Sequence, residues 1–175
     1  MSDLLRPATR EVPSGRDVDL DITVRTGSGS GLTPLAAFDQ ALMAAGVANF
    51  NLVTLSSVIP ARSVIRRTHD AIPGEHGDRL FCVMSRAWAD HPGDIAWCGL
   101  GWVRRDDGRG LFVEHHGGSA ASVVEQIQLS LTDMSLRRGG GFGQIEHALS
   151  SVHYVDRPVC ALALAAYQVV DWSSP

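Results

Sequence analysis

The residue pair Ser56-Ser57 has the clearest chemical potential in this sequence, because it ends an apolar run that begins after Asn51 and is followed by Val-Ile-Pro60. The Ser57 hydroxyl can attack the Ser56 carbonyl carbon, which turns the peptide bond into an ester by an N-to-O acyl shift. That shift is uphill unless the bond is strained and the oxyanion meets preplaced donors. Elimination of the ester leaves dehydroalanine at position 57, and hydrolysis then releases ammonia and leaves a pyruvoyl group.

A pyruvoyl group would give this chain a route to Schiff-base chemistry that its composition otherwise lacks. All fifteen basic residues are Arg, so the chain has no Lys. Amine chemistry through a Schiff base normally needs a Lys amine or a carbonyl cofactor held on one. A ketone made from Ser57 would serve as the carbonyl cofactor, because it can bond to a substrate amine and draw electrons from the substrate Cα. Loss of carbon dioxide then needs one well-placed acid. Ser-Ser pairs are common, however, and an ordinary strand end is the alternative interpretation.

The elements around this pair follow from hydrophobic periodicity. We expect a helix that is capped by Thr33 and ends at Gly46, with a buried stripe formed by Leu35, Phe38 and Leu42. Asp39 would lie at the edge of that stripe. The glycine-rich segment 27–31 before the helix reads as a flexible loop. The segment after it, 50–57, is predicted to be one strand that carries Ser56-Ser57 to its end.

The rest of the chain predicts an α+β fold. Short turns at 91–94 and 106–110 join apolar strands, which forces antiparallel pairing. This favours a single domain with an antiparallel sheet and helices on one side. In chain order, the other expected elements are strands at 18–24, 80–88, 95–103, 111–115 and 159–170, a helix at 119–136 with Val123, Ile127 and Leu131 on one face, and a short helical piece at 145–150.

Bulk composition limits the classes of function. The 175 residues suit one domain, predicted at 18–175 after a mobile tail at 1–17. A net charge of −4 argues against nucleic acid and anionic membrane as partners. The chain shows neither a transmembrane run nor a secretory signal, so we expect a cytoplasmic protein. Three widely spaced cysteines in apolar runs indicate buried reduced thiols.

Several stretches resemble one family, the pyruvoyl-dependent arginine decarboxylases. They are Thr33-Pro-Leu-Ala-Ala-Phe-Asp39, Ala45-Gly-Val-Ala-Asn-Phe-Asn-Leu-Val53 and Leu55-Ser-Ser-Val-Ile-Pro60. Gly110-Leu-Phe-Val-Glu114 resembles that family's later acidic motif. The resemblance implies a compact αββα sandwich with antiparallel sheets. It also implies assembly as trimers, sometimes paired into hexamers, with active sites between subunits.

The resemblance also implies roles for single residues. The chain would be cut between Ser56 and Ser57, and Ser57 would become the pyruvoyl cofactor. Asn51 would help stabilise the oxyanion during cleavage. Asp39 would bind the cationic end of the amino acid substrate, and Glu114 would donate the proton when L-arginine loses carbon dioxide to give agmatine.

Two positions qualify this comparison. Ala48 stands where the family has a glycine beside the substrate pocket, and its methyl group could alter substrate choice. Asn51 and Ser57 would face the same way on one strand, about 20 Å apart at roughly 3.3 Å per residue. Asn51 would then reach the Ser57 of a neighbouring subunit rather than its own, which fits a site between subunits.

Other interpretations stay open. Glu114-His115-His116 could suggest a metal site, but a strand turns His115 away from its two neighbours, so at most two ligands converge and we expect no metal. The pyruvoyl enzyme could act on a different amino acid. The chain could also be an uncleaved homologue with a structural or regulatory role.

Overall fold

The computed structural model describes residues 20–173, so the predicted tail at 1–17 lies outside the described residues. In chain order the elements are β1 (Leu20–Ser30), α1 (Pro34–Ala44), β2 (Asn51–Thr54), β3 (Val58–Ile59), β4 (Ser63–Arg67), β5 (Arg79–Ala89), β6 (Ile95–Arg104), β7 (Gly110–Gly117), α2 (Ala120–Arg137), β8 (Glu146–His153) and β9 (Val159–Val170). No helix in this part of the chain is long and apolar enough to cross a membrane.

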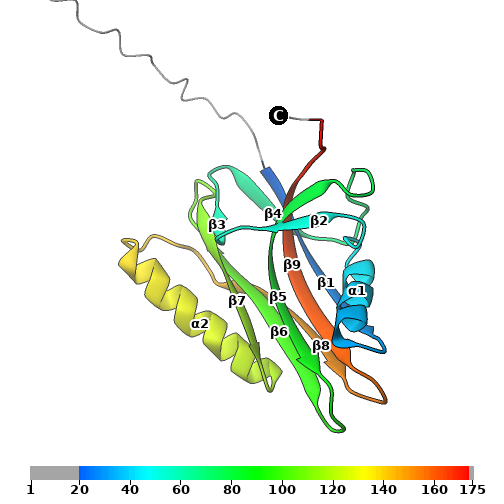
Figure 1. Ribbon diagram of the computed structural model, residues 1–175. Coiled ribbons are helices and arrows are strands. Elements are labelled where there is room, and N and C mark those ends of the chain that lie inside the picture. The colour runs from blue at the N-terminus through cyan, green and yellow to red at the C-terminus, as the bar shows by residue number, and fades with distance from the viewer. Residues whose placement is uncertain (1–19, 174–175) are drawn as a thin grey trace, which may run out of the picture.

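The strands form two stacked sheets with a helix on each outer face (Figure 1). Sheet A has the order β2-β5-β9-β1-β4 and is covered by α1, whereas sheet B has the order β3-β7-β6-β8 and is covered by α2. The α+β fold and the αββα sandwich are therefore confirmed. The expectation of helices on one side is wrong, because each sheet has a second apolar face that needs its own cover.

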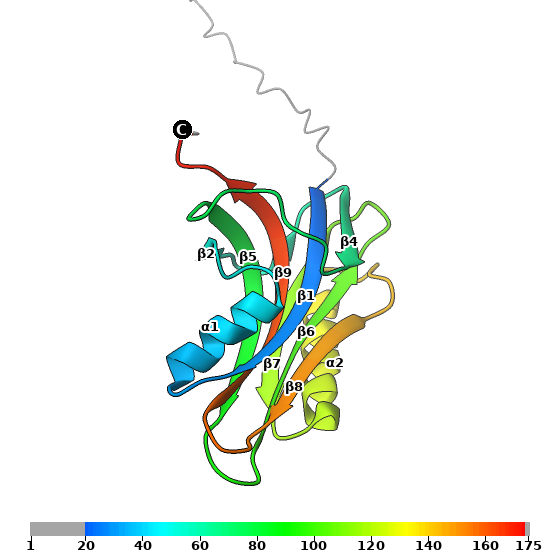
Figure 2. The same cartoon turned by 90° about the vertical axis from the view of Figure 1, so that its right-hand side faces the viewer.

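Pairing within the sheets is antiparallel except at the two edges of sheet A. There β4 runs parallel to β1 and β2 runs parallel to β5 (Figure 2). Parallel neighbours need a crossover connection rather than a hairpin. The connection from β1 to β4 includes α1. The connection from β2 to β5 includes β3 and β4.

Three apolar clusters hold the layers together. The central one lies between the sheets and includes Trp102, Phe112 and Tyr167. A second lies under α1, where the helix contributes alanines. The third lies under α2, where Val123, Ile127 and Leu131 are fully buried as predicted. The three cysteines are buried and unpaired, which confirms their prediction as reduced thiols.

Four local predictions need correction. The predicted loop at 27–31 forms the end of β1 up to Ser30, because its glycines allow α1 to lie against the strand. The predicted helical piece at 145–150 is part of β8, which pairs with β6. β4 was missed because its Arg-rich sequence resembles a polar loop. The single strand predicted at 50–57 is divided into β2 and β3, which belong to different sheets.

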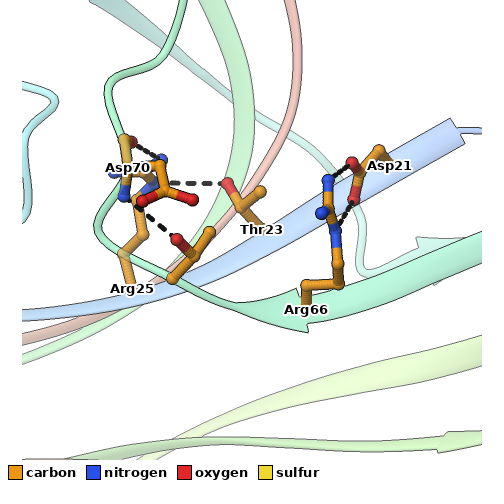
Figure 3. Close-up of polar contacts among 6 residues, drawn as sticks. Asp21, Thr23, Arg25, Arg66 and Asp70 are labelled. Atoms are coloured by element: carbon orange, nitrogen blue, oxygen red, sulfur yellow. Dashed lines mark hydrogen bonds and ion pairs between the residues drawn. The ribbon is translucent and has the colours of Figure 1, made fainter.

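A buried arginine fixes α1 to sheet A. Arg25 on β1 is only 2% exposed. Its guanidinium donates to the Asp70 carbonyl at 2.5 Å and to Thr23 Oγ1 at 3.2 Å (Figure 3). It also donates to the carbonyl of Ala45, just after α1, at 3.3 Å. Burial lowers the pKa of Arg25, while the nearby Asp70 charge opposes that shift. One side chain thus connects β1, the end of α1 and the loop that precedes β5.

Candidate active site

The Ser56-Ser57 bond lies where the chain crosses from one sheet to the other. Just before the pair, the Leu55 N–H donates to Cys82 O on β5 in sheet A at 2.9 Å. Just after it, the Ser57 carbonyl accepts from the Phe112 N–H on β7 in sheet B at 2.8 Å. The bond is therefore held from both sides, and each sheet fixes one end of the crossing.

The backbone of Ser57 is strained. Its φ is 67°, in the left-handed region that residues other than glycine rarely adopt. A residue held there costs on the order of 1–3 kcal/mol and persists only where the surroundings impose it. Here the surroundings are the two hydrogen bonds that anchor the crossing. The strain falls on the residue whose peptide bond to Ser56 was predicted to break.

The Ser57 hydroxyl donates to Glu114 Oε1, so the structure brings these two predicted residues together. Glu114 lies on β7 and is half-buried. It shares a strand face with Phe112, which packs between the sheets, because alternate residues of a strand point the same way. A carboxylate in this place can accept the hydroxyl proton and, once protonated, can return a proton to a group bound beside Ser57.

His115 points to the opposite side of β7, as predicted. Its Nε2 lies 2.9 Å from Ser130 Oγ on α2, and burial lowers its pKa. It is therefore separated from the face that carries Glu114, and Glu114-His115-His116 does not converge as a set of three ligands.

Asn51, Asp39 and Ala48 lie away from the hydrogen bonds around Ser57. The Asn51 side chain is exposed and donates to Gly77 O at the edge of sheet A. Asp39 is exposed on α1, which corrects its predicted place beside a buried stripe. That stripe is only partly correct: Phe38 and Leu42 are partly buried against the core under α1, but Leu35 is 76% exposed, and the fully buried residues are Ala37 and Ala41. Ala48 is half-buried in the turn between α1 and β2.

Sequence reasoning missed Tyr167. This residue lies on β9 and donates its hydroxyl to the carbonyl of Val58, the residue after Ser57, at 3.2 Å. Its ring meets that of Phe112 edge to face at 6.1 Å. Burial raises the pKa of Tyr167, and the charge of Glu114 adds to that shift. The available signal was a hydroxyl-bearing side chain inside the otherwise apolar run of β9.

The αββα sandwich is the fold that the resemblance to pyruvoyl-dependent decarboxylases implies. Comparison with known sequences defines the family. A family model described as "Pyruvoyl-dependent arginine decarboxylase" matches residues 21–171. The chain belongs to this family.

Curated relatives carry the same name. The protein from Thermococcus kodakarensis is 32% identical over 145 residues, which cover 81% of this chain and 90% of the relative. The protein from Halobacterium salinarum is 42% identical over 95 residues, 53% of this chain and 58% of the relative. The protein from Methanocaldococcus jannaschii is 28% identical over 148 residues, 83% of this chain and 87% of the relative. Each is named a pyruvoyl-dependent arginine decarboxylase.

Proposed function

We propose that this chain cuts itself between Ser56 and Ser57 and then converts L-arginine to agmatine and carbon dioxide with a pyruvoyl group derived from Ser57. The observation that carries the proposal is the state of Ser57. Its backbone is in a strained left-handed conformation, and its hydroxyl is hydrogen-bonded to a carboxylate.

Cleavage uses Glu114 as a base. Its carboxylate accepts the Ser57 hydroxyl proton while Oγ attacks the Ser56 carbonyl carbon. It then passes that proton to the nitrogen as the carbon–nitrogen bond breaks, which leaves an ester and a free amine. Loss of the Ser57 Cα proton then expels the Ser56 carboxylate from Cβ. Water replaces the nitrogen at Cα, and ammonia leaves. Relief of the strain at Ser57 offsets part of the cost of the acyl shift.

The residues around Ser57 can also hold and use the pyruvoyl group that cleavage produces. The Phe112 N–H, which already binds the Ser57 carbonyl, would hold the amide of the pyruvoyl residue in place. When present, the pyruvoyl ketone condenses with the substrate amine and withdraws electrons from its Cα. Glu114, in its protonated form, would deliver a proton to that carbon. Asp39 would pair with the substrate guanidinium, for which a carboxylate is a matched bidentate partner.

The proposed site lies between subunits of a homotrimer, or of a hexamer made of two trimers. Support comes from Asn51 and Asp39, which are exposed and lie away from the hydrogen bonds around their own Ser57. Apolar side chains near Asp39 are also exposed, including Leu32 at 86%, Leu35 at 76% and Met43 at 64%. Such a surface is typical of one that another subunit covers. We propose the cytoplasm as the place of action and polyamine biosynthesis as the use of the product.

Intact mass spectrometry of the denatured protein tests cleavage. We expect two chains, the longer one beginning with pyruvoyl at position 57. Ser57→Ala should remain one chain, because the nucleophile is gone. Ser56→Ala is the matched control and should still be cut, because only the acyl side chain changes. A single intact wild-type chain would contradict the proposal and favour an uncleaved structural or regulatory homologue.

Two further assays test the remaining parts. Carbon dioxide release from a panel of amino acids should be largest for L-arginine, and a different preferred substrate would move the assignment to another amino acid. Glu114→Gln should lower the turnover of each pyruvoyl-bearing chain by about 10²- to 10⁴-fold, the usual contribution of a general acid.

A mixing experiment tests the site between subunits. Asn51→Ala and Ser57→Ala chains are produced separately and also coexpressed. If Asn51 serves the neighbouring subunit, mixed oligomers contain intact sites, and some Asn51→Ala chains are cut only on coexpression. Equal cleavage of Asn51→Ala chains with and without the second variant would place Asn51 outside a shared site.

A further inference from the structure

We propose that Tyr167 is a positioning residue that anchors the new N-terminus of the long chain after cleavage. This inference rests on the proposed self-cleavage. The hydroxyl of Tyr167 donates to the Val58 carbonyl at 3.2 Å, and Val58 becomes the second residue of the long chain. Tyr167 would therefore keep the pyruvoyl carbon beside Glu114 without touching the substrate.

Cleavage removes half of the support at position 57. In the intact chain, the crossing is tied to sheet A through Leu55 and to sheet B through Ser57. After cleavage Leu55 and Ser56 belong to the other chain. Position 57 then starts a chain whose first element, β3, has two residues and pairs with β7 only at Val58 and Ile59. Val58 is 50% exposed, and chain ends of this kind fray readily.

Tyr167 is well built to hold such an end. It lies on β9, between β5 and β1 in sheet A, and is 8% exposed. The register between β5 and β9 shifts at this point: Phe81 pairs with Gln168 and Cys82 with Ala166, so Tyr167 is the extra residue of a bulge. Bulges redirect a side chain and are frequent beside active sites. The edge-to-face contact with Phe112 fixes the ring further.

The two surviving anchors act on successive carbonyls from opposite sheets. The Phe112 N–H holds the carbonyl of residue 57 from sheet B, and the Tyr167 hydroxyl holds the carbonyl of residue 58 from sheet A. Without Tyr167, the terminus is held only from sheet B, by the Phe112 N–H and the two-residue pairing of β3 with β7, and it can move away from sheet A. Tyr167 should therefore matter less for cleavage, when both flanks are tethered, than for turnover.

Tyr167→Phe tests this inference, because it removes the hydroxyl and keeps the ring against Phe112. Tyr154→Phe is the matched control, since Tyr154 is the other tyrosine of the chain and lies directly after β8, which ends at His153. Four properties are measured for each variant: the fraction of chains cut, the ketones per chain titrated with a hydrazine reagent, hydrogen exchange at the first amides of the long chain, and the steady-state kinetics (kcat per ketone and KM) with L-arginine.

For Tyr167→Phe we expect cleavage and ketone content within about twofold of wild type, faster exchange at Val58 and Ile59, and kcat per ketone lowered about 3- to 10-fold, as the loss of one neutral hydrogen bond implies. KM should change little. Tyr154→Phe should match wild type in every respect.

Unchanged exchange and unchanged kcat per ketone would overturn the anchoring role, as would a loss confined to cleavage. A fall in kcat beyond about 100-fold would instead assign the hydroxyl to proton transfer. If wild-type protein carries no ketone, the proposed function fails first, and that result is separate from any effect of Tyr167→Phe.

Discussion

The two helices cover their sheets in different ways. On sheet A, a Cβ placed on Gly29 would lie 2.6 Å from Ala37 O and from Ala41 N, both in the backbone of α1. On sheet B, a Cβ placed on Gly99 would lie 2.7 Å from Val123 Cγ1 and Leu149 Cδ2, both at the ends of side chains. Thus α1 rests on its sheet backbone to backbone, whereas α2 is separated from its sheet by a layer of aliphatic side chains.

This difference in packing agrees with the position of each helix relative to the crossing segment at Ser57. α1 leads through a short turn into β2 and then directly into the strained crossing at Ser57. A helix fixed through its own backbone, with Arg25 bonded to the carbonyl of its C-cap residue Ala45, gives that crossing a rigid origin. α2 contacts β7 only from the face that carries His115, so its layer can adapt by rotamer changes without moving Glu114. The more tightly packed layer is the one that leads to the site.

Gly29→Ala should have the largest effect on stability. The new methyl group meets backbone atoms of α1, which can move only if the whole helix shifts. We expect a loss of about 3 kcal/mol or more in the free energy of unfolding. Gly99→Ala places its methyl group against side-chain ends that can change rotamer, so we expect a loss of about 1 kcal/mol. Urea unfolding of both variants measures the difference.

A double variant sharpens this test. Adding Val123→Ala to Gly99→Ala makes room for the new methyl group, so the two changes should cost less together than the sum of their separate costs. No substitution within α1 can do the same for Gly29→Ala, because the obstacle is the helix backbone. Equal losses for Gly29→Ala and Gly99→Ala would show that the two layers are equally adaptable.

Arg25→Met should have an intermediate effect. It keeps an unbranched side chain but leaves the buried carbonyl of Ala45 and the carbonyl of the exposed residue Asp70 without this donor. We expect a loss of about 2 kcal/mol in the free energy of unfolding. Arg137→Met on α2 is the comparison: its ion pair with Asp133 is 2.8 Å long but exposed, so we expect no measurable change. If both variants had wild-type stability, Arg25 would not lock α1.

The same contrast explains which elements the sequence could predict. α2 was predicted with its buried face because Val123, Ile127 and Leu131 are large and recur at helical spacing. α1 was predicted with its Thr33 cap but with only part of its buried face, since its fully buried residues are alanines that carry little hydrophobic signal. The glycines of β1 were taken for a loop for the same reason. Packing through small residues is invisible to hydrophobic periodicity.

The residues of the candidate site also fall into two groups, those that the sequence could predict and those that it could not. Ser56-Ser57 and Glu114 could be predicted because local motifs identify them, and the structure brings Ser57 and Glu114 together. Tyr167 could not, because its role depends on a bulge in the pairing of β9 with β5. The strain at Ser57 was also hidden, since it arises where two sheets hold one crossing segment. Register and crossing geometry are tertiary properties that no short motif encodes.

The smallest expected effect is on the pH dependence of stability, through His115 at the contact between β7 and α2. Burial lowers the pKa of His115, with His116 acting in the same direction and Glu114 against it. The unfolded chain, with a His pKa of about 6.5, then binds more protons than the folded one below that pH. The stabilising contribution is therefore present above about pH 6.5 and is lost as the pH falls toward the folded-state pKa.

His115→Gln tests this contribution. Glutamine can still pair with Ser130 but does not titrate, so the loss of stability between pH 7 and pH 5 should be smaller in the variant than in wild type. The helix α1 carries no histidine, so any pH response of its layer should survive the substitution. Urea unfolding at both pH values measures the two slopes. An identical slope in wild type and His115→Gln would show that the contact between β7 and α2 is insensitive to protonation.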